Sequence, residues 1–148
     1  MAEKIPQQVF TIEAVNALVP RLNELVGRQL DRRTYIESRL RELSTITGEV
    51  PEAIVLEGND TKQVGELKRD LIVRIEEYQA GWREVEDLGA VLKDPRMGLV
   101  DFYGNVEGKL VWLCWKYGES EVTHYHALDE GYSGRKELRA SIKHRLLN

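Results

Sequence analysis

Residues 98–135 read GLVDFYGNVEGKLVWLCWKYGESEVTHYHALDEGYSGR, and this stretch decides the fold. Apolar runs of strand length alternate in it with turns that contain glycine, a pattern typical of short antiparallel strands. The run LVWLCWKY (110–117) is apolar on both sets of alternating positions, so a strand there has two covered faces and lies inside a sheet. We therefore predict four strands with three turns. The strands cover 90–93, 98–103, 109–117 and 121–126, and the turns cover 94–98, 104–108 and 118–120.

The chain before this stretch has the periodicity of long helices. Apolar residues recur at steps of three, four or their sums from Val15 to Ile46, and at steps of three and four from Val64 to Leu88. The spacing predicts two helices, about 50 and 40 Å long at 1.5 Å per residue, that pair as an antiparallel hairpin over 12–88. The segment QLDRR (29–33) is poor in apolar residues and is predicted to project into solvent or to meet a polar partner.

The ends of both helices carry recognisable signals. Thr11 is predicted to cap the first helix and Gly48 to end it in the left-handed conformation. Asn59 or Asp60 is predicted to cap the second helix. Pro20 should either kink the first helix or split off a short segment over 12–19, because proline lacks the backbone N–H that the helix requires.

The apolar stripes on the two helices are wider than a simple two-helix seam. The first stripe is flanked by Val19, Val26, Leu30 and Leu40, and the second by Ile72. A lone hairpin cannot cover these flanks, whereas a four-helix arrangement of two hairpins can. We therefore predict a homodimer.

The predicted fold class is α+β, with the helical hairpin followed by a small antiparallel sheet over 90–126. Leu138, Ile142 and Leu146 recur at steps of four and predict a short closing helix over 133–147. A length of 148 residues fits a single domain over 1–148.

Composition excludes several classes of protein. The net charge of −4 argues against nucleic-acid binding, because only the stretch from Lys136 onward is basic, with four Lys or Arg and one acid. One cysteine excludes an internal disulfide. No apolar run approaches the roughly 18 residues of a membrane span, and residues 1–8 lack a signal pattern. We expect a soluble, cytoplasmic protein.

The histidines of HYH (124–126) are the sharpest chemical feature. Alternate residues of a strand share a face, so both imidazoles could bind one metal, with Asp101, Glu119 or Asp129 completing the shell. The alternative is that one histidine is exposed and the other forms a local hydrogen bond. Asp101 lies in an apolar strand and needs a partner such as Arg135 or Lys116, or a set of backbone amides. It is either part of a buried salt bridge or a site acid.

Three further residues have competing interpretations. Glu119 follows a glycine at a turn and is most simply a solvated turn residue. Asp129 and Arg135 bracket a glycine-rich loop that could bind an anion before a helix, or could be an ordinary loop with Asp129 as a cap. Cys114 is predicted to be a buried, inert apolar residue.

Motifs along almost the whole chain resemble those of the bacterial family labelled domain of unknown function 2203. Those motifs are FT (10–11), NALVP (16–20), KD (93–94), GLVDF (98–102), LCW (113–115), GE (118–119), His126, Asp129, Gly131, Gly134 and Arg135. The resemblance implies no activity, because the family is uncharacterised. It implies that Asp101, Glu119, His126, Asp129 and Arg135 form one cluster. His124 is not among the matching positions, so the resemblance favours His126 over the histidine pair.

Two functional hypotheses follow. The first is a non-enzymatic homodimeric binding or scaffold protein. The second is a small metal- or anion-binding enzyme, with a site formed by Asp101, Glu119, His126, Asp129 and Arg135. Nucleic-acid binding is a weaker third possibility.

Overall fold

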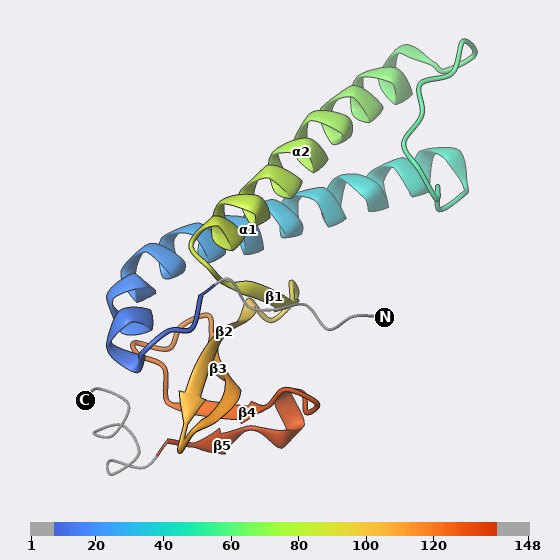
Figure 1. Ribbon diagram of the computed structural model, residues 1–148. Helices are drawn as coiled ribbons and strands as arrows, with labels where there is room; N and C mark the ends of the chain where they lie inside the picture. Colours follow the sequence, from blue (N-terminus) through green and yellow to red (C-terminus); the bar gives the residue numbers. More distant parts are fainter. Residues whose placement is uncertain (1–7, 139–148) are drawn as a thin grey trace.

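A computed structural model of the chain describes residues 8–138. Two long helices form a hairpin, and five strands form one antiparallel sheet in the order β1-β2-β3-β4-β5 (Figure 1). The prediction of an α+β fold is therefore confirmed. The elements are α1 (Ile12–Thr47), α2 (Lys62–Asp87), β1 (Val91–Asp94), β2 (Leu99–Val106), β3 (Lys109–Lys116), β4 (His124–Ala127) and β5 (Lys136–Glu137).

Helix α1 begins and ends where its caps predict. Thr11 Oγ1 accepts a hydrogen bond from the amide of Ala14 at 3.0 Å, and Gly48 ends the helix with φ 77°. Pro20 lies inside the helix, so a split into two helices is wrong. Figure 1 shows α1 as one helix that curves towards its N-terminal end, and such curvature relieves the clash that proline causes.

Helix α2 begins one or two residues later than the predicted caps Asn59 and Asp60 imply. Its N-cap is Thr61, whose Oγ1 accepts from the amide of Val64 at 3.2 Å. Asp60 is occupied differently, because its carboxylate accepts from Lys68 Nζ and from the amide of Glu57, both at 2.8 Å. A carboxylate committed to the preceding loop cannot also satisfy the first amides of the helix, which leaves that role to Thr61.

The hydrophobic core lies between the sheet and the first half of α1. Val15, Leu22 and Val26 of α1 are fully buried, and they share one cluster with Phe102 and Trp115 of the sheet. Phe10 extends the sheet before α1 begins: its amide donates to the carbonyl of Tyr103 at 2.6 Å, and its ring packs edge-on against Phe102. The sheet thus covers the flanking positions Val19 and Val26 that the sequence analysis assigned to a dimer.

The β2–β3 hairpin has a tighter turn than predicted. The strands pair through to Val106 and Lys109, so the loop is Glu107-Gly108 and not the five residues 104–108. Both turn residues have positive φ, 53° for Glu107 and 83° for Gly108, as in the two-residue turns whose twist matches that of the strands. This turn pairs Asp101 with Cys114.

The hairpin of helices extends past the sheet as an arm with its own small core (Figure 1). That second core consists of the buried residues Ile36, Leu43, Val64, Leu67 and Leu71. We define the distal hairpin as residues 33–47 of α1 and 62–78 of α2.

A polar contact joins the two cores, and it involves the QLDRR segment. Gln29 is fully buried and donates from Nε2 to the carbonyl of Tyr78 at 2.6 Å, while Arg33 donates to the Tyr78 hydroxyl at 3.2 Å. Projection of 29–33 into solvent is therefore wrong, and the polar partner is α2. Gly81 permits the contact, because a Cβ there would lie 2.0 Å from Gln29 Oε1.

The prediction of a closing helix over 133–147 is wrong for residues 133–138. Residues Tyr132–Gly134 form one 3-10 turn, and Lys136–Glu137 pair with β4 as strand β5. The amide of Leu138 donates to the carbonyl of Thr123, and a helix starting at 133 would forgo this pairing. Positions 139–147 of the predicted helix lie outside the described residues.

Neither α1 nor α2 combines the length and the apolar character that crossing a membrane would require, and this holds for the described residues as a whole.

Candidate functional site

The face of the sheet that points away from the helices carries the polar cluster. Side chains alternate along each strand, so Phe102 and Leu113 enter the helix-covered core while Asp101, Cys114 and His126 face the other way. All three of these polar side chains are buried, with exposed fractions of 0%, 0% and 2%. The cluster therefore lies out of water, although it is on the face opposite the helices.

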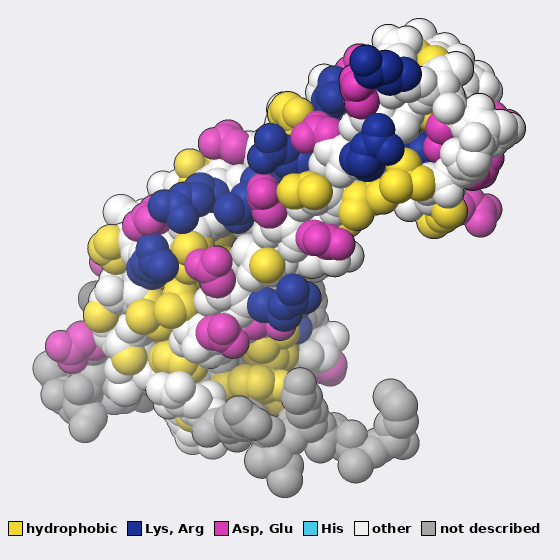
Figure 2. Space-filling view, turned by 90° about the horizontal axis from the view of Figure 1, so that it is seen from above, with side chains coloured by type: hydrophobic (Ala, Val, Ile, Leu, Met, Phe, Trp, Pro, Cys, Tyr) yellow, Lys and Arg dark blue, Asp and Glu magenta, His cyan; other side chains and the backbone are white. Residues whose placement is uncertain are grey.

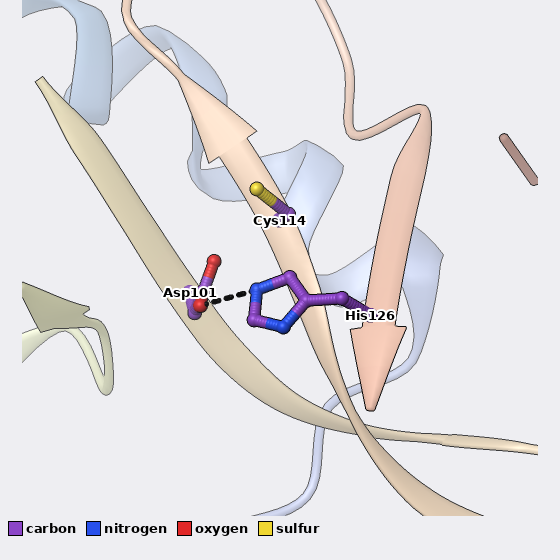
Figure 3. A group of neighbouring side chains, drawn as sticks. All are labelled: Asp101, Cys114 and His126. Carbon is purple, nitrogen blue, oxygen red and sulfur yellow. Dashed lines mark hydrogen bonds and ion pairs between the residues drawn. The ribbon is translucent and has the colours of Figure 1, made fainter. Parts of the chain in front are cut away.

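Asp101 and His126 form the central contact of this cluster. Asp101 is on β2 and His126 is on β4, and His126 Nε2 lies 2.8 Å from Asp101 Oδ2. Figure 3 shows the imidazole lying over β3 to reach the carboxylate on the far side. The sequence analysis proposed Arg135 or Lys116 as the partner of Asp101, and the partner is His126 instead.

The second ring nitrogen determines where the proton lies. His126 Nδ1 is 3.0 Å from the carbonyl oxygen of Ala127, which can only accept, so Nδ1 carries a hydrogen. One proton is then shared between Nε2 and Oδ2. Either a protonated Asp101 donates it to a neutral imidazole, or an imidazolium donates it to the carboxylate.

Burial raises the pKa of the Asp101 carboxyl, although the nearby His126 opposes this change. Oδ2 is bonded to His126, whereas Oδ1 is buried and forms no hydrogen bond of regular geometry among the described residues; the Cys114 thiol interacts with the same carboxyl and also opposes the rise in its pKa. A buried carboxyl oxygen without a regular hydrogen bond is costly, which makes Asp101 the most unusual polar group of the cluster.

Cys114 lies directly beside this pair. It is opposite Asp101 in the strand register, and burial together with the charge of Asp101 raises the pKa of its thiol to about 12. The predicted burial of Cys114 is confirmed. Cys114 nevertheless has polar neighbours, because ligand atoms of Asp101, Cys114 and His126 all lie within 4.8 Å of one another.

A second charged pair borders the cluster. Arg135 donates from Nη2 to Glu119 Oε1 at 2.6 Å and to the carbonyl of Cys114 at 3.4 Å. Glu119 also accepts from the amide of Lys116 at 2.7 Å, so it is not a solvated turn residue. Burial lowers the pKa of Arg135, but the neighbouring Cys114 and Glu119 outweigh this effect and raise it.

The turn that holds Glu119 is attached to α1. The side chain of Asn16 accepts from the amide of Val122 at 2.7 Å, and Asn23 contacts Gly118 and the carbonyl of Glu119. The indole of Trp115 donates to the same carbonyl at 3.0 Å. The first half of α1 therefore positions the edge of the site through two asparagines.

Four of the five predicted site residues lie near each other. They form two pairs, Asp101 with His126 and Glu119 with Arg135, and not one open pocket. Asp129 is exposed and has no hydrogen bond or ion pair within residues 8–138, so it is not part of the cluster. His124 shares the face of His126, but its Nδ1 lies 2.7 Å from the Thr123 hydroxyl. His124 is not in the group of possible ligand atoms that lie within 4.8 Å of one another, so among the described residues the two histidines do not form a common ligand set.

Cys114 belongs to the cluster, although it was not among the site residues predicted from the sequence. The turn contained a signal that could have identified it. With a two-residue loop at Glu107-Gly108, each residue of β2 pairs with the residue of β3 whose number completes a sum of 215. That register brings Cys114 opposite Asp101, whereas the five-residue loop that we predicted does not.

The fold and this cluster define a class of α+β protein in which a helical hairpin covers one face of a small antiparallel sheet and a buried acid–histidine–cysteine group lies on the other. Residues 8–138 match the model of the uncharacterized conserved protein family DUF2203, and the chain belongs to this family. No curated protein and no solved structure matches the chain.

Proposed function

We propose that this protein is a homodimeric, non-enzymatic binding or scaffold protein of the bacterial cytoplasm, and that its dimer interface lies on the distal hairpin. The observation that carries the proposal is an open apolar groove of ≈ 430 Å³ on this arm. The helices of the distal hairpin contribute Leu40, Ile72, Ile75 and Glu76 to its lining, and the loop that joins them contributes Pro51, Glu52, Ala53 and Ile54.

The groove contains the two flanking positions that the sheet leaves uncovered. Val19 and Val26 pack on the sheet, whereas Leu40 and Ile72 lie farther along the helices and are half-buried. Figure 2 shows hydrophobic side chains at the surface of the arm between charged ones. Exposed apolar grooves with a polar rim are typical of protein interfaces.

A second copy of the chain is the occupant that fits this groove best. The distal hairpin is about 25 Å long at 1.5 Å per residue, and two helices side by side are about 20 Å wide. One face of the distal hairpin with this length and width has an area of about 500 Å². A symmetric pair would then bury about 1,000 Å² in total, which is the size expected of a small specific interface. Two hairpins placed flank to flank form a four-helix arrangement.

Sedimentation velocity of the wild type and two variants tests this proposal. Ile72→Glu introduces a charge into the groove and is expected to give a monomer. Val73→Glu is the matched control, because Val73 is the next residue of α2 and is already 50% exposed. We expect this control to remain a dimer. A wild-type protein that is strictly monomeric at micromolar concentration contradicts the proposal.

The second candidate function is a small metal- or anion-binding enzyme. The buried Oδ1 of Asp101 beside His126 favours metal binding. The anion alternative has less support, because the guanidinium of Arg135 is already bound to Glu119 and to the carbonyl of Cys114. Thermal-shift measurements with metals, nucleotides and anions, repeated with His126→Ala, separate these alternatives.

A further inference from the structure

We infer that Asp101, Cys114 and His126 form a binding site for a zinc ion. The inference deepens the metal-binding part of the second candidate function and is independent of the dimer. Three possible ligand atoms, one from each residue, lie within 4.8 Å of one another. Each residue comes from a different strand of one sheet, so the ladders β2–β3 and β3–β4 hold the three side chains at defined positions (Figure 3).

The three ligand types select the metal. A thiolate, an imidazole nitrogen and a carboxylate oxygen are the groups that bind Zn²⁺ in proteins. The thiolate disfavours Mg²⁺ and Ca²⁺, which prefer oxygen ligands only. Three protein ligands also leave one tetrahedral position for a ligand from outside the group.

Two polar atoms point to a cation in this position. Asp101 Oδ1 is buried and forms no hydrogen bond of regular geometry within residues 8–138, and the thiol of Cys114 is the polar group that interacts with this carboxyl besides His126. His126 Nδ1 donates to the carbonyl of Ala127 at 3.0 Å, which turns Nε2 towards the carboxylate. Metal-binding histidines are commonly oriented in this way, by a hydrogen bond from the other ring nitrogen to a backbone carbonyl.

The charges of the buried group balance when the ion is present. Binding of a divalent ion releases two protons, the one shared by His126 Nε2 and Asp101 Oδ2 and the one on the Cys114 thiol. The ion is then neutralised by the carboxylate of Asp101 and the thiolate of Cys114, with a neutral His126. The adjoining Arg135 and Glu119 neutralise each other at 2.6 Å. The group therefore has no net charge with the ion bound, which avoids the large penalty for burying an unpaired ion.

Cobalt(II) reconstitution of the full chain without an affinity tag tests the site. Because the site is closed, Co²⁺ and Zn²⁺ are offered both to the native protein and during refolding, and loosely bound metal is then removed by dialysis. We expect about one ion per chain and the absorption band of a cobalt–thiolate bond, since Co²⁺ replaces Zn²⁺ with similar geometry.

The variants separate this site from other metal binding. Cys114→Ser should abolish the cobalt–thiolate band, and Asp101→Asn and His126→Ala should each weaken binding at least about 10-fold. His124→Ala is the matched control on the same strand and should bind as tightly as the wild type. Circular dichroism identifies the variants that fold, and only those are compared.

Three results overturn the inference. They are a folded wild-type protein with substoichiometric metal after refolding, a wild-type cobalt complex without the thiolate band, and loss of binding in His124→Ala equal to that in His126→Ala. Each of these rejects the site while the sedimentation result for the dimer is unaffected. If metal binds as expected but substrate screens detect no turnover, the enzymatic part of the second candidate fails and the site remains.

Discussion

Asp101 and His126 lie on strands that are not neighbours, and their side chains meet across β3 at 2.8 Å. The contact is diagonal, because the residue opposite Asp101 on β3 is Cys114 and the residue opposite His126 is Trp112. A single hydrogen bond thus ties together the second and fourth strands of the sheet in a region closed to water.

Removal of either partner of this contact should destabilise the metal-free protein strongly. Asp101→Ala or His126→Ala should each lower the free energy of unfolding by about 3 kcal/mol, because the remaining group is buried without a partner. The double variant should lose at least about 1 kcal/mol less than the sum of the two. Urea unfolding in the presence of a chelator measures all three, with His124→Ala as the control, and strictly additive losses would contradict a direct coupling.

Gly81 should not tolerate alanine, although alanine usually favours helices by about 1 kcal/mol. The new Cβ would lie 2.0 Å from Gln29 Oε1, so Gly81→Ala should lower the free energy of unfolding by about 1–3 kcal/mol through displacement of the buried Gln29. Gly65→Ala in the same helix is the control, since its Cβ would contact only the flexible Arg69 side chain at 3.4 Å. Thermal unfolding should show opposite shifts for the two variants, and equal shifts would contradict the role of Gly81.

Cys114 should resist alkylation in the native protein. Its thiol is fully buried and has a pKa of about 12, compared with an ordinary value of 9.0. The buried thiol and its raised pKa both reduce the reactive thiolate at pH 8, so in the metal-free protein labelling by iodoacetamide should be slower than in the urea-unfolded chain by at least about 100-fold. Mass spectrometry follows the labelling, and rapid modification of native protein would show that the thiol is open to solvent.

The charge of Asp70 should contribute to stability at neutral pH and not in acid. The hydroxyl of Tyr35 donates to Asp70 Oδ2 at 2.7 Å, and this bond together with Arg39 lowers the pKa of the Asp70 carboxyl despite partial burial. The stabilisation is complete above the unfolded pKa of about 3.9 and is lost as the pH falls through the lower folded value. Asp70→Asn should therefore be less stable than the wild type at pH 7, by less than about 1 kcal/mol for a surface pair.

The comparison of pH 7 with pH 2 provides the check on Asp70. Urea unfolding should give a smaller difference between the wild type and Asp70→Asn at pH 2, because protonation of the carboxyl in acid removes the contribution of its charge. Asp129→Asn serves as the control, because its side chain is exposed and has no hydrogen bond within the described chain. A difference that stays constant between the two pH values would contradict the assigned role of the charge.

Local patterns determined the helices and strands of this protein. The cap at Thr11, the glycine at the end of α1 and the apolar spacing of α1 and α2 are properties of neighbouring residues, so their sequence is sufficient to predict them. The central position of β3 also follows locally, because a strand that is apolar on both faces must be covered on both. The N-cap of α2 was misassigned because Asp60 bonds to Lys68, a residue eight positions away.

Only the tertiary structure decided the composition of the candidate site. Asp101, Cys114 and His126 are 12 to 25 residues apart in the sequence. They meet only because of the registers of β2 with β3 and of β3 with β4, since a shift of one residue in either register would turn the side chains to the opposite face of the sheet. The register of β2 and β3 depends on the two-residue turn at Glu107-Gly108, which local glycine content alone did not distinguish from a longer loop. Sequence therefore determined which residues are strands and which are polar, whereas strand pairing determined that Asp101 meets His126 across Cys114.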